Sequence, residues 1–244
     1  MSNQPLGGKS ALVTGGARRV GRGITLALAE AGAHVAITYR TSHAEAVETV
    51  REIERLGRRA LAVDCDVRSE DSVRSAVAAV VGRFGRLDLL VNNAAVFESA
   101  SLDSLTLEQW DTVFETNARG PFLVAREALT ALRAAEGRIV NIGSLGGMKA
   151  WAGHAHYCAS KAALHMLTQA MAKSFAPEVS VNCVAPGWIE LDEKYSGQSA
   201  HFAAKTPMRR NGSVDDVAQA VLFFATGPHF VTGQVLAVDG GLGL

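Results

Sequence analysis

The feature that most constrains the fold is an alternation of short apolar runs with longer amphipathic stretches. Seven runs, each flanked by Gly, Asn or Asp, lie at residues 11–15, 34–39, 59–67, 87–93, 137–144, 179–187 and 233–241. Their nearly continuous, β-branched character predicts strands that are buried on both faces, as in parallel sheets. Parallel neighbours need helical crossovers, which are right-handed. We therefore predict an α/β Rossmann fold, with a doubly wound, seven-stranded parallel sheet and helices on both faces.

The stretches between the runs carry helix signals. The segment 22–32 ends at Gly32, and the segment 42–57 opens with Ser42 three residues before Glu45, a capping-box spacing that recurs from Ser69. No linker rich in Pro, Gly or Ser interrupts the chain, so we predict one domain over 1–244. A polar and aromatic insertion, 188–213, leaves the carboxyl end of the sixth strand, where ligands bind in such sheets, and we interpret it as a substrate lid.

Composition excludes several function classes. The chain has 24 basic and 24 acidic residues, so no global field attracts nucleic acid or a membrane surface. Its apolar runs are too short to span a bilayer and its first residues lack a secretory signal, which predicts a cytoplasmic protein. Three cysteines lack CxxC spacing, and His154, His156 and His165 have no acid at ligand spacing. We expect no metal site and expect these histidines in a pocket or on the surface.

The first run leads into the glycine-rich turn "TGGARRVGRG", residues 14–23. A glycine turn between a first strand and a first helix is typical of a dinucleotide site, because backbone N–H groups there bind a pyrophosphate. An NAD site places an acid at the end of the second strand, but this strand ends in Tyr39 and Arg40. Arg18, Arg40 and Ser42 are candidates for binding a 2′-phosphate, which favours NADPH and NADP+; the alternative is that the arginines merely solvate a turn.

A second constellation follows the fifth run. Ser144 ends the run, and Tyr157 and Lys161 lie four residues apart, on one face of a predicted helix. An ammonium beside a phenol is expected to bring the tyrosine pKa towards neutrality, and a serine hydroxyl can polarise a substrate carbonyl. The alternative is an ordinary pair on a helix surface.

These features resemble the short-chain dehydrogenase/reductase family over essentially the whole chain. The matching motifs are the glycine turn, "DV" at 66–67, "NNAA" at 92–95, Asn117, Ser144, "YCASK" at 157–161, "NCVAPG" at 182–187 and the terminal "TGQVLAVDGG". The resemblance implies catalysis by Asn117, Ser144, Tyr157 and Lys161, with Tyr157 as general acid and Asn117 relaying protons through a water near Lys161. With the turn residues, the expected dinucleotide site comprises Gly15, Arg18, Arg19, Val20, Gly21, Tyr39, Arg40, Thr41, Ser42, Asp66, Val67, Asn93, Ala94, Ala95, Tyr157, Lys161, Pro186, Gly187 and Ile189.

Two departures from the family pattern bear on the site. Arg19 stands where the family usually has glycine, which resembles the pteridine-reductase branch, and Leu191 stands where a threonine often binds the nicotinamide carboxamide. Ser144 stands where that branch generally has an aspartate, and serine suits a carbonyl oxygen. We therefore expect a 3-oxoacyl-type carbonyl reductase first, a dihydropterin reductase second, and a non-catalytic NADP(H)-binding protein as the alternative of another class.

The substrate end is expected to include Phe97, Ser144, Trp151, Tyr157 and Trp188, although Phe97 and Trp151 could instead pack the core. The expected partner is a small carbonyl compound or pterin, with no nucleic acid and no membrane. The family resemblance also implies a homotetramer built through helices over about residues 106–133 and 155–176.

Overall fold

The computed structural model describes residues 4–191 and 196–244, and its core is one seven-stranded sheet. The strand order is β3-β2-β1-β4-β5-β6-β7, with every neighbouring pair parallel, which confirms the predicted fold class. The order reverses between β1 and β4, and in sheets of this kind ligands bind beyond the carboxyl ends of the strands at such a point. The strands are β1 (Ser10–Val13), β2 (His34–Tyr39), β3 (Ala60–Asp64), β4 (Leu89–Asn92), β5 (Arg138–Ile142), β6 (Ser180–Pro186) and β7 (Val235–Val238).

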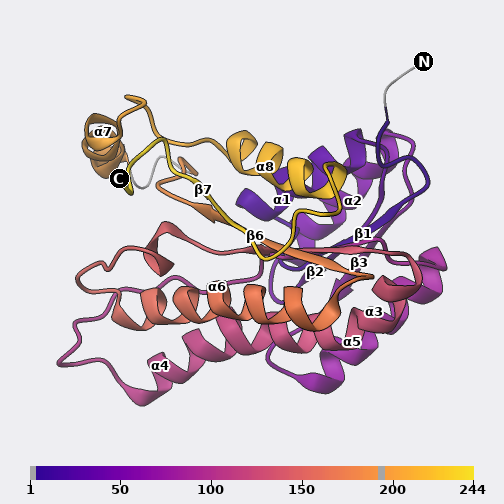
Figure 1. The fold of residues 1–244 in the computed structure, drawn as a ribbon, viewed down its shortest axis with the longest axis horizontal. Coiled ribbons are helices and arrows are strands. Elements are labelled where there is room, and N and C mark those ends of the chain that lie inside the picture. The colour runs from indigo at the N-terminus through magenta and orange to yellow at the C-terminus, as the bar shows by residue number, and fades with distance from the viewer. Residues whose placement is uncertain (1–3, 192–195) are drawn as a thin grey trace.

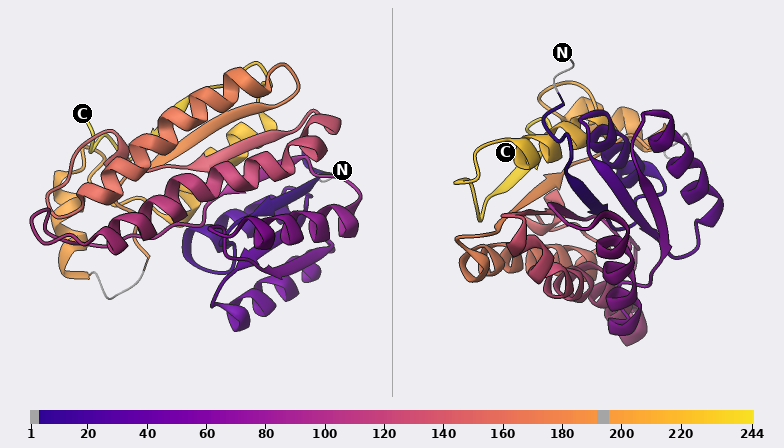
Figure 2. Two further views of the ribbon diagram at one scale, coloured as in Figure 1. Left: turned by 90° about the horizontal axis from the view of Figure 1, so that it is seen from below. Right: turned by 90° about the vertical axis from the view of Figure 1, so that its right-hand side faces the viewer.

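Helices cover both faces of the sheet (Figures 1 and 2). One layer holds α1 (Arg19–Glu30), α2 (His43–Arg55) and α8 (Val214–Thr226), and the other holds α3 (Glu70–Phe84), α5 (Gly120–Ala134) and α6 (Ala155–Phe175). Side chains alternate between the two cores along each strand: Ala11 and Val13 of β1 join the first core, and Leu12 joins the second. Burial on both faces explains the continuous apolar runs.

Strand positions agree with the sequence prediction, whereas several ends do not. The run expected to extend over 59–67 is a strand only to Asp64, because the following residues turn towards α3. The last strand was expected to be buried on both faces, and this is wrong for β7. It forms the edge of the sheet beside β6, and its Leu236 is 40% exposed.

The helix caps differ from the sequence prediction at Ser42. This residue precedes α2, but its side chain accepts no capping hydrogen bond and its φ and ψ of −96° and 53° are not those of an extended cap, so the predicted capping box is wrong. Ser69 does cap α3 by accepting a hydrogen bond from the Ser72 N–H at 3.3 Å. Its box is incomplete, because serine rather than an acid occupies that third position.

The helix expected over 106–133 divides into α4 (Leu107–Phe114), a π-helical turn (Glu115–Arg119) and α5. Such π-turns are frequent at functional sites. The insertion 188–213 contains α7 (Ser196–Lys205), at the left of Figure 1. No helix among the described residues has the length and apolar character needed to cross a membrane.

Candidate active site

A cavity of about 1620 Å³ lies at the carboxyl ends of the central strands and joins the glycine turn to Ser144, Tyr157 and Lys161. Pockets for a single small ligand are typically about 300–1,000 Å³, so this cavity has room for a dinucleotide and a second molecule. Every residue expected at the dinucleotide and substrate sites lines it. Of the predicted site residues, only Asn117 does not.

The glycine turn presents backbone rather than side chains to the cavity. Gly15 has a φ of +64°, and a Cβ on Gly21 would lie 2.2 Å from the Gly15 carbonyl oxygen, so a larger residue would not fit there. The Asn93 amide, from the end of β4, donates to the carbonyls of Thr14 and Gly15 at 2.9 and 3.1 Å. This contact, which was not foreseen from the sequence, fixes the turn against the end of β4.

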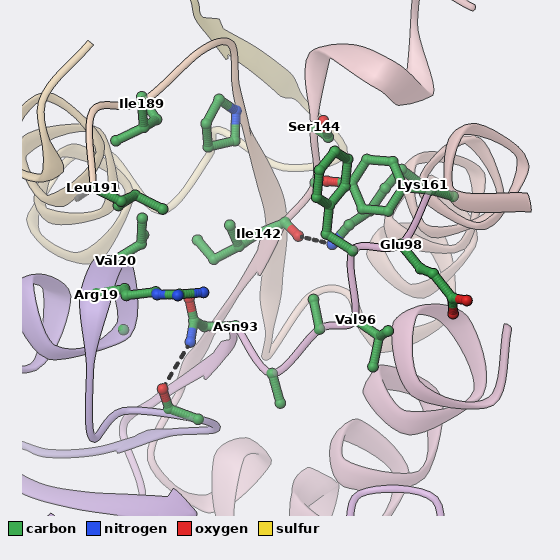
Figure 3. A pocket seen from close by; sticks show the side chains of 18 of the residues that line it. Arg19, Val20, Asn93, Val96, Glu98, Ile142, Ser144, Lys161, Ile189 and Leu191 are labelled. Carbon is green, nitrogen blue, oxygen red and sulfur yellow. Dashed lines mark hydrogen bonds between the residues drawn. The ribbon is translucent and has the colours of Figure 1, made fainter. Parts of the chain in front are cut away.

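Arg19 adopts an uncommon backbone conformation, with a φ of +52°. This left-handed region favours glycine and costs other residues roughly 1–2 kcal/mol. The conformation explains why the family usually has glycine at this position. Figure 3 shows the Arg19 side chain reaching into the cavity beside Asn93. The backbone is thus strained at Arg19, and the guanidinium of this residue lies inside the cavity.

The part of the cavity beside Arg18 and Arg40 contains more basic than acidic side chains. Arg18, Arg40, Thr41 and Ser42 line this part of the cavity. Asp66 lies nearby, but Arg68 binds its carboxylate, with Nη2 and Oδ2 2.6 Å apart, and this hydrogen bond, helped by the more distant charge of Arg40, holds the Asp66 pKa below its usual range. Asp66 is the one acid among the residues expected at the dinucleotide site, and the charge of Arg68 balances it.

Ser144, Tyr157 and Lys161 meet where β5 and α6 come together. Ser144 follows β5, accepts a hydrogen bond from the Gly146 N–H at 3.0 Å and has its hydroxyl near enough to the Tyr157 phenol to lower the pKa of that phenol. Tyr157 and Lys161 lie in the first two turns of α6. The Lys161 Nζ donates to the Ile142 carbonyl at 2.8 Å (Figure 3) and lies 5.9 Å from the centre of the Tyr157 ring. The structure thus brings Ser144, Tyr157 and Lys161 together, as predicted.

The pKa values of this group differ from the sequence prediction. Burial raises the pKa of Tyr157 to about 12, against the smaller opposing effect of its hydrogen bond with Ser144. Burial likewise lowers the pKa of Lys161 to about 8. The expectation that the ammonium brings the phenol pKa towards neutrality is wrong for this structure, because desolvation raises that pKa and the opposing effect comes from Ser144 rather than from Lys161. Both groups hold their protons at pH 7.

Asn117 lies in the π-turn and is fully buried. Its Oδ1 accepts from the Val96 N–H at 2.8 Å, and its Nδ2 donates to the Val96 carbonyl at 2.9 Å and to the Ser160 Oγ at 3.1 Å. The side chain therefore joins the loop after β4 to α6. This contact is with residues distant in sequence and was not foreseen. The proton relay implied by the family resemblance stays a prediction.

Aromatic rings form the walls beside Tyr157. Phe97 is 56% exposed; its ring lies parallel to that of His154 with centres 4.8 Å apart and meets Tyr157 edge-on at 4.8 Å. Trp151 stacks on Tyr157 at 6.1 Å. Trp188 stacks on Phe202 of α7 at 4.1 Å, and both line the same cavity. The expected pocket residues are thus brought together.

Some lining residues and two histidines depart from expectation. Val96 and Glu98 line the cavity without having been foreseen; their place directly after "NNAA" is the signal that could have identified them. His154 lines the cavity as expected, but His156 and His165 lie in the protein interior, neither in the pocket nor on the surface. Over 4–191 and 196–244, no three His, Cys, Asp or Glu residues are grouped as metal ligands.

Comparison with known proteins places this site in a family. A family model described as enoyl-(acyl carrier protein) reductase matches residues 15–243. The chain is 37% identical over 240 residues to 3-oxoacyl-[acyl-carrier-protein] reductase FabG of Staphylococcus aureus, covering 96% of this chain and 98% of that protein. These two names denote different reactions, so they identify the family more firmly than the substrate.

Comparison with solved structures leads to the same family. A blue fluorescent protein from a metagenomic library, in complex with NADPH, is 37% identical with a TM-score of 0.92, over 98% of this chain and 99% of that one. A mutant short-chain dehydrogenase/reductase of Serratia marcescens is 33% identical with a TM-score of 0.94, over 98% of this chain and 100% of that one. This protein belongs to the short-chain dehydrogenase/reductase family of oxidoreductases.

Proposed function

We propose that this protein is an NADPH-dependent reductase that transfers hydride to a ketone carbonyl, with Tyr157 as the general acid. The observation that carries the proposal is the meeting of the Ser144 hydroxyl, the Tyr157 phenol and the Lys161 amine in a cavity that also contains the glycine turn. The name of the S. aureus relative supports a 3-oxoacyl thioester as substrate.

The cavity suits a dinucleotide with a 2′-phosphate. The backbone of Gly15 and Gly21 leaves space that a side chain would fill, and Arg18, Arg40 and Ser42 line the end where the extra phosphate would bind. Arginine binds phosphate through paired, charge-assisted hydrogen bonds. The relative solved with NADPH supports this choice. When bound, NADPH supplies the hydride, and the remaining chemistry belongs to this chain's side chains.

Each catalytic side chain has a distinct task in the proposed reaction. The Ser144 hydroxyl donates a hydrogen bond to the substrate carbonyl oxygen as negative charge develops there. Tyr157, which is protonated at pH 7, donates its phenolic proton to that oxygen. Lys161 then stabilises the phenolate. In balance, the carbonyl carbon gains a hydride and its oxygen gains a proton, so that ketone, NADPH and a proton become alcohol and NADP+.

The segment 188–213 is proposed to cover the substrate. Trp188, Leu191, Phe202 and Lys205 of this segment line the cavity, and the stacked rings of Trp188 and Phe202 give the segment an apolar inner face.

A dihydropterin is the second candidate substrate, and one observation favours it. The Phe97 ring is more than half exposed although it lines the cavity, so a flat heterocycle could stack on it. Ser144 argues for the ketone, because a hydroxyl suits a carbonyl oxygen better than a ring nitrogen.

A homotetramer is proposed from the family resemblance. Phe122 on α5 and Met166 on α6 are 40% and 64% exposed, and contact between copies through these helices would bury them. Light scattering on the purified protein measures the mass directly, and a monomer would contradict the proposal.

The test is NADPH oxidation with a panel of 3-oxoacyl thioesters, simple ketones and dihydropterins. Tyr157→Phe should lower turnover by a factor of about 10²–10⁴ while the variant still binds NADPH, as measured by calorimetry. Full activity of this variant would contradict the role of Tyr157. Tight NADPH binding by the wild type without turnover of any compound would support the non-catalytic binding protein instead.

A further inference from the structure

His165 lies behind the catalytic serine, in the second turn of α6 after Tyr157. The spacing of Tyr157, Lys161 and His165 is i, i+4, i+8, which places all three on one face of the helix. His165 is 7% exposed and does not line the cavity, whereas Gly143, Ser144 and Leu145 do. The imidazole therefore supports the cavity wall from the protein side.

The imidazole makes a directional contact with Ser144. The Ser144 backbone N–H is directed at His165 Nε2, with N and Nε2 3.4 Å apart in a buried environment. An amide nitrogen can only donate, so Nε2 must be the unprotonated acceptor, and any proton of the neutral ring is on Nδ1. A buried backbone N–H left without an acceptor is costly, so this contact favours one position of the serine.

Two glycines make room for the ring. A Cβ on Gly143 would lie 2.3 Å from His165 Nε2, and a Cβ on Gly147 would lie 2.6 Å from His165 Cε1. The turn carrying Ser144 thus packs against the imidazole at both of its ends, at Gly143 and at Gly147. Leucine or phenylalanine at 165 could fill the same space, but neither would offer an acceptor to the serine N–H.

The groups around His165 keep it neutral. Burial, helped by the charge of Lys161 on the same helix, lowers the pKa of His165 to about 4. On β6, the Cys183 thiol lies beside Gly143, and burial raises its pKa to about 12, so it carries no charge at pH 7. The imidazole is therefore an acceptor throughout the neutral range.

We propose that His165 is a positioning residue: by accepting the Ser144 N–H and filling the space between Gly143 and Gly147, it fixes the serine hydroxyl against the Tyr157 phenol. The inference rests on the proposed function of Ser144 and Tyr157. It adds a residue that touches neither substrate nor cofactor. Position 165 needs a hydrogen-bond acceptor where Nε2 lies. A buried side chain without an acceptor would not meet this need.

Three substitutions separate positioning from packing. Gln places its amide where Nε2 lies, Asn reaches only to the position of Nδ1, and Leu supplies bulk without an acceptor. We expect His165→Leu and His165→Asn to lower kcat about tenfold or more, since misplacement of a catalytic group by about 1 Å can cost about 100-fold. His165→Gln should stay within about threefold of the wild type, and KM for NADPH should be unchanged in all three.

Thr168→Val is the matched control. Thr168 is also fully buried on α6, and its hydroxyl accepts from the Asn141 Nδ2 of β5 at 2.9 Å. This variant removes a buried hydrogen bond between α6 and β5 but leaves the Ser144 N–H with its acceptor. It should lower the melting temperature with little change in kcat.

Crystal structures give a readout that does not depend on turnover. Ser144 Oγ should move away from the Tyr157 hydroxyl in His165→Leu and keep its wild-type position in His165→Gln. An unmoved serine in His165→Leu, wild-type kcat in that variant, or no advantage of Gln over Leu would overturn the proposal. If no substrate is found, the proposed reaction fails, but the structural comparison still decides the role of His165.

Discussion

Lys161 should make the native protein less stable at neutral pH than a neutral residue of the same size would. Lys161 is 3% exposed, and among the described residues only the Cys183 thiol opposes the lowering of its pKa, with no contribution from an Asp or Glu. The pKa lowered to about 8 expresses this cost of burying an ammonium. Lys161→Met keeps the length of the side chain and removes the charge, so it should abolish turnover without destabilising the fold.

The size of the effect follows from the pKa. One pKa unit corresponds to about 1.4 kcal/mol, so a fall from 10.5 to about 8 places the cost of the native-state charge near 3 kcal/mol. Methionine also leaves the Ile142 carbonyl without its 2.8 Å donor, a loss of about 1–3 kcal/mol. At pH 7, Lys161→Met should therefore be as stable as the wild type or more stable, by up to about 2 kcal/mol.

The pH dependence gives the sharper test. Between about pH 8 and 10.5, the unfolded chain holds the Lys161 proton while the native protein has released it. Wild-type stability therefore rises with pH in this window, relative to a variant that lacks the group. From pH 7 to pH 10, the wild type should gain about 2–3 kcal/mol over Lys161→Met.

Urea unfolding at pH 7, 8, 9 and 10, at one protein concentration, measures this difference. Other groups that titrate in the range, such as Tyr157, are common to both proteins and largely cancel. Lys173→Met, on the exposed side of the same helix, is the control and should follow the wild-type curve. Parallel curves for the wild type and Lys161→Met would refute the claim that the native protein buries an unfavourable charge.

Three further changes test other parts of the structure. Arg40→Asp should weaken NADPH binding at least about tenfold and spare NADH, by calorimetry; an unchanged preference after adding Arg18→Ala would refute the phosphate assignment. Gly23→Ala should destabilise the fold, because its Cβ would lie 2.0 Å from Val214 Cγ1, and Val214→Ala should restore part of the loss in a urea-unfolding cycle; additive effects would contradict this contact. Ser69→Ala should cost about 1 kcal/mol by loss of the α3 cap, and an unchanged midpoint would show the cap to be unimportant.

The fold could be predicted from the sequence because its signal is local. Each buried strand appears as an apolar run, and each crossover helix as an amphipathic stretch. An apolar pattern does not show where the hydrogen bonds of a strand end. The run expected over 59–67 therefore proved longer than the strand, which stops at Asp64. The edge strand β7 is apolar in sequence yet partly exposed, because an apolar run does not reveal which strands have a neighbour on both sides.

Most of the candidate site could also be predicted, but its energetics could not. Spacing in the chain placed Ser144, Tyr157 and Lys161 together. Sequence distance conceals that Asn117 binds Val96, 21 residues away, and that His165 supports Ser144, again 21 residues away. Sequence distance also conceals burial, which affects the pKa of Tyr157 more strongly than the neighbouring Ser144 hydroxyl does.

The direction of these pKa shifts suits a proton donor better than the acidified phenol that the sequence suggested. At pH 7, Tyr157, His165 and the Cys183 thiol are all neutral, and Lys161 is the charged member of the group. Burial makes the phenolate costly and the isolated ammonium costly. In the proposed reaction, Tyr157 gives up its proton, and each charge then gains the other as a partner inside the same low-dielectric site. The ammonium therefore stabilises the charge-separated product of proton transfer more than the resting enzyme, which is the differential stabilisation that catalysis requires.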